Sequence, residues 1–439
     1  MKLKSLLLGS AAALALSTGA QAADPVAEFV SLDVCDAYGI SGLTVASDDT
    51  CLLISGEVEY DYWYEEVNGT TSRASLLDWN LSFEATTQTD AGRAIAAIKL
   101  VDAEAVAWSD ADDDGLIDAG EAGLIPGVAI DEAYVSFGDT TVLTAGLTGS
   151  LFGLANDQYI LSDTSLVGDP GTSAVFQVVS DLGNGLSVGA AIEALADDPG
   201  GILGGQQTGG RAGVVVGYDD GSIVANLGAY VYDLYNTIDN GSDTLWDVYA
   251  DVATSFDIVS IYADIAAGYG DANTGIAGNE TYVRGSLSGE VALDIATIRA
   301  GVRALYEDGS GNTEIAAGAG VMFALTDTVD LDVAVIYNDK NTALDDNFNT
   351  YPLSSDLGAD RVHGIVTLSN AFTDTLSGSV WATVAYDTNA SQVDGYGAGV
   401  TAEYAPGGDF VLDGGAGVFY DNVNSETDYA VHLGAKKSF

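Results

Sequence analysis

The stretch DYAVHLGAKKSF (residues 428–439) decides the fold, because its alternate positions form two sets of different character. One set is apolar and comprises Tyr429, Val431, Leu433, Ala435 and Phe439. The other set is polar or small and comprises Asp428, His432, Gly434, Lys436 and Ser438. Successive side chains of a β-strand point to opposite faces, so this pattern predicts a strand with one apolar and one polar face.

The same alternation recurs from Cys51 onward. Residues 54–64, 77–84 and 329–337 carry apolar side chains at every second position. This repetition predicts an all-β chain in which one face of each strand meets an apolar medium and the other meets water. Two arrangements satisfy it. In a soluble sandwich the apolar face points inward, and in a transmembrane barrel it points toward lipid.

The N-terminal residues favour the barrel, because they have the pattern of a secretory signal. Lys2 and Lys4 precede an apolar run, Leu6–Leu16, and a small-x-small cleavage site at Ala20-Gln21-Ala22. We therefore expect a signal peptide over residues 1–22 and a mature chain that starts at Ala23. The alternative, a membrane anchor, is disfavoured because the apolar run is shorter than the ~20 residues that span a bilayer.

The C-terminal residue points the same way. A last strand that ends on Phe439 resembles the assembly signal of bacterial outer-membrane proteins. Lys437 lies on the apolar face and departs from the pattern, but it falls near the expected membrane edge, where a lysine can snorkel to water. We expect an exported outer-membrane protein that is delivered to lipid and lipopolysaccharide by the barrel-assembly machinery.

The charge balance limits the partners. The chain has 13 basic and 65 acidic residues, and the signal peptide removes two lysines and no acid, so the mature charge is 11 − 65 = −54. Nucleic acid is excluded, because binding phosphates needs a basic surface. Attraction of the polypeptide to anionic lipid headgroups is disfavoured. An acidic protein of this kind attracts cations.

The connections between the expected strands alternate in length. Short turns are expected near Thr89–Gly92, Gly138–Thr141, Gly183–Gly185, Asp219–Ser222, Asp327–Thr328, Asp374–Thr375 and Pro406–Gly408. Longer polar loops are expected near 102–127, 152–173, 197–210, 236–243, 270–279, 339–360 and 388–394. Short turns at one end and long loops at the other are typical of outer-membrane barrels. The count is about 20 strands over residues 51–439, preceded by a periplasmic N-terminal segment, residues 23–50.

A family resemblance is visible near the N-terminus. Val34-Cys35-Asp36-Ala37-Tyr38-Gly39 and Thr50-Cys51-Leu52-Leu53-Ile54-Ser55-Gly56 resemble the opening of α-proteobacterial porins of the rhizobial and Brucella type. The resemblance implies a trimeric, 16-stranded, water-filled diffusion porin with a constriction loop folded into the lumen. The chain departs from the family at Ala46-Ser47-Asp48-Asp49-Thr50, where members carry a Pro-Gly-Thr run. It is also longer than most members, so the strand number stays open between 16 and about 20.

Cys35 and Cys51 are the two cysteines of the chain. In an exported protein bound for an oxidising compartment they are expected to form a disulfide. Closing a loop of this size contributes about 3 kcal/mol in the chain-entropy model. Two free thiols are the alternative.

The resemblance also implies the residues of a pore constriction. The expected strand Thr141–Thr148 is followed by a loop at about 151–173, in which Phe152 and Tyr159 are candidate contacts to the wall. The acids that the resemblance places at the constriction are Asp157, Asp163 and Asp169. The candidate basic residues of the opposite wall are Lys99, Arg284, Arg299 and Arg303. With so few basic residues the pore is expected to prefer cations. Alternatively, the loop acids are solvated surface residues.

A calcium-binding pattern stands in the expected second extracellular loop. Residues 110–121 match the 12-residue EF-hand loop, with candidate ligands at Asp110, Asp112, Asp114, Leu116 (backbone carbonyl), Asp118 and Glu121. Ca²⁺ needs several oxygens that converge from one tight loop, with a glycine at its turn, here Gly115. The alternative is a solvated acidic loop, and no amphipathic helices flank it. By resemblance the second loop reaches a neighbouring subunit, so bound Ca²⁺ would stiffen a homotrimer.

Other functions find less support. An outer-membrane enzyme needs a nucleophile with a base, and the chain has two histidines, His363 and His432, with no nucleophile motif beside either. A structural or adhesive calcium-binding solenoid would show a short Gly/Asp repeat, and none is present. A substrate-specific channel shares every feature of a diffusion porin for small hydrophilic solutes and ions, and the sequence does not separate the two.

Overall fold

The computed structural model describes residues 35, 43–46, 49–67, 69–90, 92–102, 128–152, 172–193, 210–232, 234, 245–270, 281–308, 311, 313–339, 361–423 and 425–439. The elements of this part are all β-strands: β1 (Leu43–Ala46), β2 (Thr50–Val67), β3 (Thr70–Thr89), β4 (Gly92–Asp102), β5 (Val128–Phe137), β6 (Thr141–Gly149), β7 (Thr172–Gly183), β8 (Leu186–Glu193), β9 (Arg211–Asp219), β10 (Ile223–Tyr232), β11 (Leu245–Phe256), β12 (Val259–Tyr269), β13 (Thr281–Ala292), β14 (Ala296–Glu307), β15 (Thr313–Ala324), β16 (Val329–Asn338), β17 (Arg361–Thr373), β18 (Leu376–Asp387), β19 (Gln392–Gly407), β20 (Phe410–Asp421) and β21 (Glu426–Ser438).

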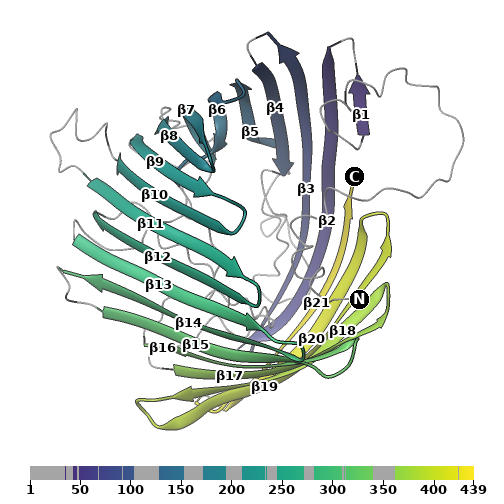
Figure 1. The fold of residues 1–439 in the computed structure, drawn as a ribbon. Helices are drawn as coiled ribbons and strands as arrows, with labels where there is room; N and C mark the ends of the chain where they lie inside the picture. Colours follow the sequence, from purple (N-terminus) through teal and green to yellow (C-terminus); the bar gives the residue numbers. More distant parts are fainter. Residues whose placement is uncertain are drawn as a thin grey trace, which may run out of the picture.

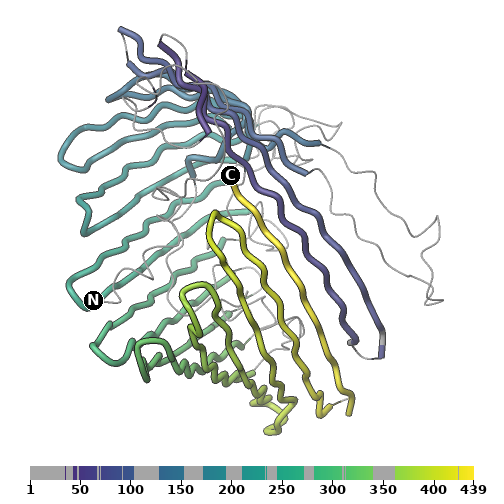
Figure 2. Tube along the Cα trace, turned by 90° about the vertical axis from the view of Figure 1, so that its right-hand side faces the viewer, coloured from purple at the N-terminus to yellow at the C-terminus, as the bar shows by residue number. Residues whose placement is uncertain are grey.

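The strands form one closed antiparallel barrel. Each strand from β2 to β20 pairs with the next along the chain, and β21 returns to pair with β2, so twenty described strands, β2 to β21, make the ring (Figure 1). Figure 2 shows the first strands running beside the last. The count of about 20 strands is confirmed. The number 16, which the resemblance implied, is wrong for this chain, because its extra length forms additional strands.

The seam between β2 and β21 closes the barrel. β21 pairs with β2 from Glu57 to Glu66, and the backbones of Gly56 and Phe439 exchange two hydrogen bonds of 3.0 and 2.9 Å. β1 pairs with the same edge of β2 nearer to its N-terminal end, from Cys51 to Ile54. β1 therefore covers the part of that edge that the last strand leaves unpaired, where an open row of backbone groups would invite another strand.

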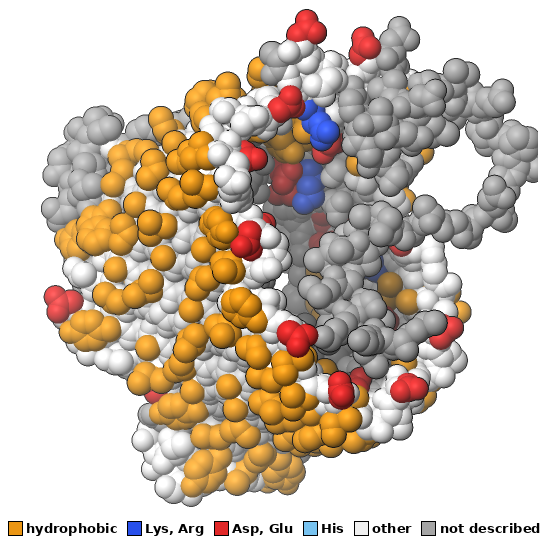
Figure 3. Space-filling model, in the orientation of Figure 1, with side chains coloured by type: hydrophobic (Ala, Val, Ile, Leu, Met, Phe, Trp, Pro, Cys, Tyr) orange, Lys and Arg blue, Asp and Glu red, His pale blue; other side chains and the backbone are white. Residues whose placement is uncertain are grey.

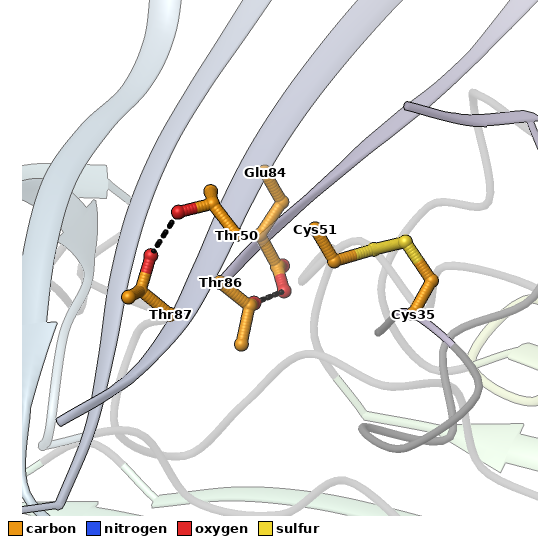
Figure 4. Close-up of a disulfide and its surroundings, with 6 residues drawn as sticks. All are labelled: Cys35, Thr50, Cys51, Glu84, Thr86 and Thr87. Carbon is orange, nitrogen blue, oxygen red and sulfur yellow. Dashed lines mark hydrogen bonds between the residues drawn. A yellow bond between two sulfur atoms is a disulfide. The ribbon is translucent and has the colours of Figure 1, made fainter. Parts of the chain in front are cut away.

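The expected disulfide is present. Cys35 and Cys51 are bonded, their Cα atoms lie 5.1 Å apart, and both side chains are buried (Figure 4). Beside Cys51, the hydroxyls of Thr50 and Thr87 share a hydrogen bond of 2.8 Å that links β2 to β3. The disulfide ties Cys35, which precedes the barrel, to the start of β2. The signal peptide and its cleavage site lie outside the described residues.

The short turns follow the expected pattern with informative exceptions. All seven expected short turns separate consecutive strands, from β3–β4 to β19–β20. Two turns of the same kind were missed, at Asp257–Ile258 and at 293–295, because their apolar residues continue the alternation of the strands; Asp257 itself takes the left-handed conformation with φ 50°. The long loop expected over 388–394 is wrong, since residues 388–391 alone separate β18 from β19.

The barrel is apolar outside and polar within. Large apolar side chains are exposed on alternate positions, among them Leu227, Leu433 and Ile265 at 61, 57 and 55%. Figure 3 shows such side chains spread over the outer wall; basic side chains are visible inside the opening, and acidic ones lie both there and along the rims. The transmembrane alternative is therefore the one that the fold adopts. No helix in the described ranges has the length and apolar character needed to cross a membrane.

Candidate pore wall

The inward face of each strand can be read from its burial pattern. On β11, Asp247, Tyr249 and Asp251 are buried, whereas Trp246 and Val248 are 38 and 41% exposed. Polar and titratable side chains are thus turned inward and apolar ones outward, the reverse of a soluble core. The pairing of residues between strands then identifies the inward residues of the neighbouring strands, because directly opposed residues share a face.

The loop that follows β6 begins inside the barrel. Glu193, at the end of β8, is fully buried and accepts hydrogen bonds from Ser150 Oγ at 2.5 Å and from the backbone N–H of Leu151 at 2.7 Å. The Phe152 backbone N–H donates to Ser150 Oγ at 3.1 Å. The expected wall contact of Phe152 is present, since its buried ring stacks on Tyr230 with centroids 5.2 Å apart. The root of the expected constriction loop is therefore fixed to the lumen wall.

An aromatic cluster receives this root. Phe152 packs with Tyr230, Tyr232 and Tyr249 from β10 and β11, and Leu151 and Leu245 border the cluster. The Tyr232 hydroxyl donates to the Tyr269 carbonyl at 3.2 Å. Rings of this size bury a large apolar area while their hydroxyls remain able to hydrogen-bond, which suits a wall that meets both a loop and water.

The acids of this wall are held by hydroxyl and amide donors. The Tyr282 hydroxyl donates to Asp247, and Ser286 donates to Asp264 through its hydroxyl and, at 3.1 Å, through its backbone N–H. The Asn226 amide donates to Asp251 at 3.1 Å. Buried carboxylates are stable when they accept hydrogen bonds of this kind, so these acids are fixed parts of the wall.

All four expected wall basics point into the lumen, in two groups. Lys99 on β4 forms an ion pair of 2.6 Å with Asp131, the extra residue of a β-bulge in β5. Arg284, Arg299 and Arg303 lie on the adjacent strands β13 and β14; Arg299 pairs with Asp332, and the Arg284 guanidinium lies 5.0 Å from the centre of the Tyr282 ring.

The two groups face each other across the barrel. β4 and β14 are ten positions apart (14 − 4) in a ring of twenty strands. The expected constriction acids Asp157, Asp163 and Asp169 lie outside the described residues, so their approach to either group is a prediction. The expected calcium ligands from Asp110 to Glu121 lie outside them too, and the described ranges contain no cluster of three or more His, Cys, Asp or Glu residues suited to a metal ion.

Sequence reasoning missed other charged residues of the lumen. Arg361 on β17 forms an ion pair of 2.6 Å with Asp394 on β19, and Arg211 at the start of β9 is buried opposite Glu193. Each arginine directly follows an expected long loop, and this position at the start of a strand was the one feature of the sequence that could have marked them as residues of the lumen. Their partners were not predictable, because the pairing of strands depends on registers that the sequence leaves open.

A second charged wall follows the seam. Lys436 on β21 lies 2.8 Å from Glu57 and 3.6 Å from Glu59 on β2. His432 lies four residues before Lys436 on the same face of β21, and it contacts Asp61 on β2 and Asp413 on β20. Acids outnumber bases on this side of the lumen, and each base present touches two of them.

The chain has curated relatives over a limited stretch. It is 54% identical to porin Omp2a of Brucella ovis over 66 residues, which are 14% of this chain and 19% of that porin. It is 52% identical to porin Omp2b of Brucella suis biovar 1 over 66 residues, 14% of this chain and 18% of that porin. The match spans about a fifth of the length of these relatives, and it confirms the resemblance to porins of this type. No protein-family model matches the chain.

Solved structures share the fold. OccK9 (OpdG) of Pseudomonas aeruginosa is similar with a TM-score of 0.52 at 12% identity, covering 88% of this chain and 98% of that one. OccAB3 of Acinetobacter baumannii is similar with a TM-score of 0.51 at 11% identity, covering 88 and 99%. At such identities the likeness concerns the fold alone. The barrel and the porin relatives place the chain in the bacterial outer membrane.

Proposed function

We propose that the chain is a porin, a water-filled channel through which small hydrophilic solutes and ions diffuse passively. The closed twenty-strand barrel with an apolar outer surface and a charged, hydrogen-bonded inner wall carries the proposal. A barrel of this many strands encloses more space than its own wall side chains fill. The porin relatives favour a channel over an enzyme.

The proposal includes a preference for cations. The chain has 65 acidic residues against 13 basic ones, and the described bases of the lumen are largely paired with acids at short range. Paired bases contribute little net positive potential, so the unpaired excess of acid determines the field in the pore. Cations are then concentrated in the lumen and anions are depleted.

The constriction is proposed to form between the loop after β6 and the wall bases. Its root at Ser150 to Phe152 is fixed to Glu193 and Tyr230, inside the lumen. Asp157, Asp163 and Asp169 follow this root in the sequence. Their carboxylates would face Lys99 on one wall and Arg284, Arg299 and Arg303 on the other.

The proposal extends to the assembly of the chain and to a bound ion. We expect a homotrimer, by resemblance to the porin family, and weak Ca²⁺ binding at residues 110–121, with Kd of about 10⁻⁴–10⁻³ M as in extracellular modules. Calorimetry of the folded protein with Ca²⁺ tests the site. D110N/E121Q should abolish the binding heat, whereas D157N, an acid in another loop, should leave it unchanged.

Reconstitution in a planar bilayer tests the channel. Conductance steps in groups of three, with a reversal potential under a KCl gradient that favours K⁺, are the expected result. Folded, heat-modifiable protein without conductance would overturn the porin proposal. Conductance with anion preference would overturn the cation preference and leave the porin proposal in place.

A further inference from the structure

His432 is held between two carboxylates on two other strands. Its Nε2 lies 2.7 Å from Asp61 Oδ1 on β2, and its Nδ1 lies 3.2 Å from Asp413 Oδ2 on β20. The ring also packs on Trp63, with centroids 4.1 Å apart, and the side chain is 9% exposed. The imidazole therefore bridges three neighbouring strands on the lumen side of the seam.

Counting donors gives the charge of this ring. A neutral imidazole has one N–H donor and one nitrogen that can only accept, whereas an ionised carboxylate only accepts. If the ring were neutral, one carboxylate would face a nitrogen lone pair at hydrogen-bond distance. An imidazolium donates at both nitrogens and satisfies Asp61 and Asp413 together.

The surroundings are acidic on every strand that faces the ring. The charged side chains on the inward face of β2, β3, β19, β20 and β21 near it are Glu57, Glu59, Asp61, Glu65, Asp78, Glu403, Asp413, Asp428 and Lys436. Lys436 is paired with Glu57 and Glu59. The imidazolium of His432 thus offsets part of the negative charge of this wall.

We propose that His432 is a selectivity-determining residue, a positive charge that two carboxylates hold in the acidic wall of the pore. This inference deepens the proposed function and rests on it. With the imidazolium present, the Asp61–His432–Asp413 group carries a net charge of −1. When an uncharged side chain replaces the imidazolium, the group carries −2, and the pore prefers cations more strongly.

The test is the reversal potential of the reconstituted wild type and of H432Q at one pH under a KCl gradient. The glutamine amide keeps one donor and one acceptor without the charge. Removing one unit of positive charge at ~10 Å in water favours cations about twofold and disfavours anions about twofold, so the cation-to-anion permeability ratio of H432Q should be about fourfold higher than that of the wild type. An unchanged or lower ratio in H432Q would overturn the inference.

The chain supplies a matched control in its other histidine. His363 also lies on an inward face, on β17, but its direct cross-strand neighbours are Ile336 and Ala385. H363Q should keep the wild-type permeability ratio, and a ratio raised in H363Q but not in H432Q would overturn the assignment to His432. Absence of conductance in every variant and in the wild type would instead count against the porin proposal itself.

A second measurement reads the protonation of the ring directly. In protein labelled with ¹⁵N at histidine, the signals of the two rings can be assigned with H363Q. We expect both ring nitrogens of His432 to carry protons under the conditions of the conductance measurement. A signal from an unprotonated nitrogen of His432 there would contradict the bridging imidazolium.

Discussion

At the scale of single residues, Glu193 shows how one buried charge positions a loop. A fully buried carboxylate is costly unless every lone pair is used. Here Ser150 and the backbone of Leu151 donate to it, so part of the cost of burial is offset when the loop root lies against the wall, in addition to the buried Arg211 opposite on β9. The same contact also places the Phe152 ring on Tyr230.

We expect E193A to release this root. The variant leaves the Leu151 N–H and the Ser150 hydroxyl without their acceptor, and hydrogen bonds to a charged group contribute about 1.5–3 kcal/mol each. Amide hydrogen exchange should become faster at Leu151 and Phe152, while the amides of β8 and β10 keep their protection. E290Q, which alters a lumen-side glutamate on β13, is the control. Unchanged exchange at Leu151 in E193A would show that the carboxylate does not hold the root.

A turn residue outside the membrane carries the clearest pH effect. The backbone N–H groups of Ile223 and Ser222 donate to Asp220 at 2.9 Å each, and with the Tyr218 hydroxyl they hold the pKa of Asp220 below its ordinary value. Because the folded pKa is lowered, the stabilising contribution is present above the unfolded value of ~3.9 and is lost as the pH falls through the lowered pKa.

We therefore expect the Asp220 carboxyl signal to titrate at a lower pH than that of an unstructured aspartate. The measurement is ¹³C NMR of the folded protein, with D220N to assign the signal. The Ile223 amide should keep its chemical shift until that same pH and change with it. A midpoint at or above the ordinary value would mean that the turn hydrogen bonds do not persist in the membrane protein.

At the scale of elements, the strands were predictable and their partners were not. The alternation in residues 54–64 and 428–439 identified the first and last strands, and turn residues marked seven of the connections, five of them with a glycine. The turn at Asp257–Ile258 was missed, because Ile258 continues the apolar alternation of the strand into the turn. The contact of His432 with Asp61 spans 371 residues and depends on strand number and register together.

The seam is the element that should respond most to charge reversal. It joins strands that are nearly the whole barrel apart in sequence, so its contacts must offset the largest loop-closure entropy of any strand pair. K436E places a third acid beside Glu57 and Glu59. We expect a loss of about 1 kcal/mol, as is typical of partly exposed pairs, and a several-fold faster unfolding rate at elevated temperature.

The double variant E57K/K436E restores opposite charges and should recover most of the lost stability. The control is the corresponding reversal of Lys99 and Asp131, which pair at 2.6 Å between consecutive strands. Reversing one partner there should change the unfolding rate less. If both pairs responded equally, the closure of the barrel would not depend on the seam in particular.

At the scale of the whole molecule, the sequence predicted the class of fold and the outward apolar face, because both follow from a local period of two. It predicted less of the pore. The four expected wall bases lie on inward strand faces and their place at a constriction stays a prediction, whereas the pairs Arg361–Asp394 and Lys436–Glu57 became visible only once twenty strands were closed in register. The number of strands stayed open between 16 and about 20, because the resemblance that implied 16 covers a short stretch, whereas the count of about 20 depends on the full length.

The net charge leads to a final prediction about the whole pore. If the excess of acid acts through the summed field of the lumen, its effect must be screened by salt, whose Debye length falls from about 10 Å at 0.1 M to about 3 Å at 1 M. The preference for K⁺ over Cl⁻ should therefore decline steeply as KCl is raised over this range at a fixed gradient ratio. If a single tight site at the constriction set the preference instead, ions in direct contact with its carboxylates would be screened little, and the preference would persist at 1 M. Permeability ratios at three or more salt concentrations distinguish the two, and a ratio independent of salt would contradict control by the summed charge.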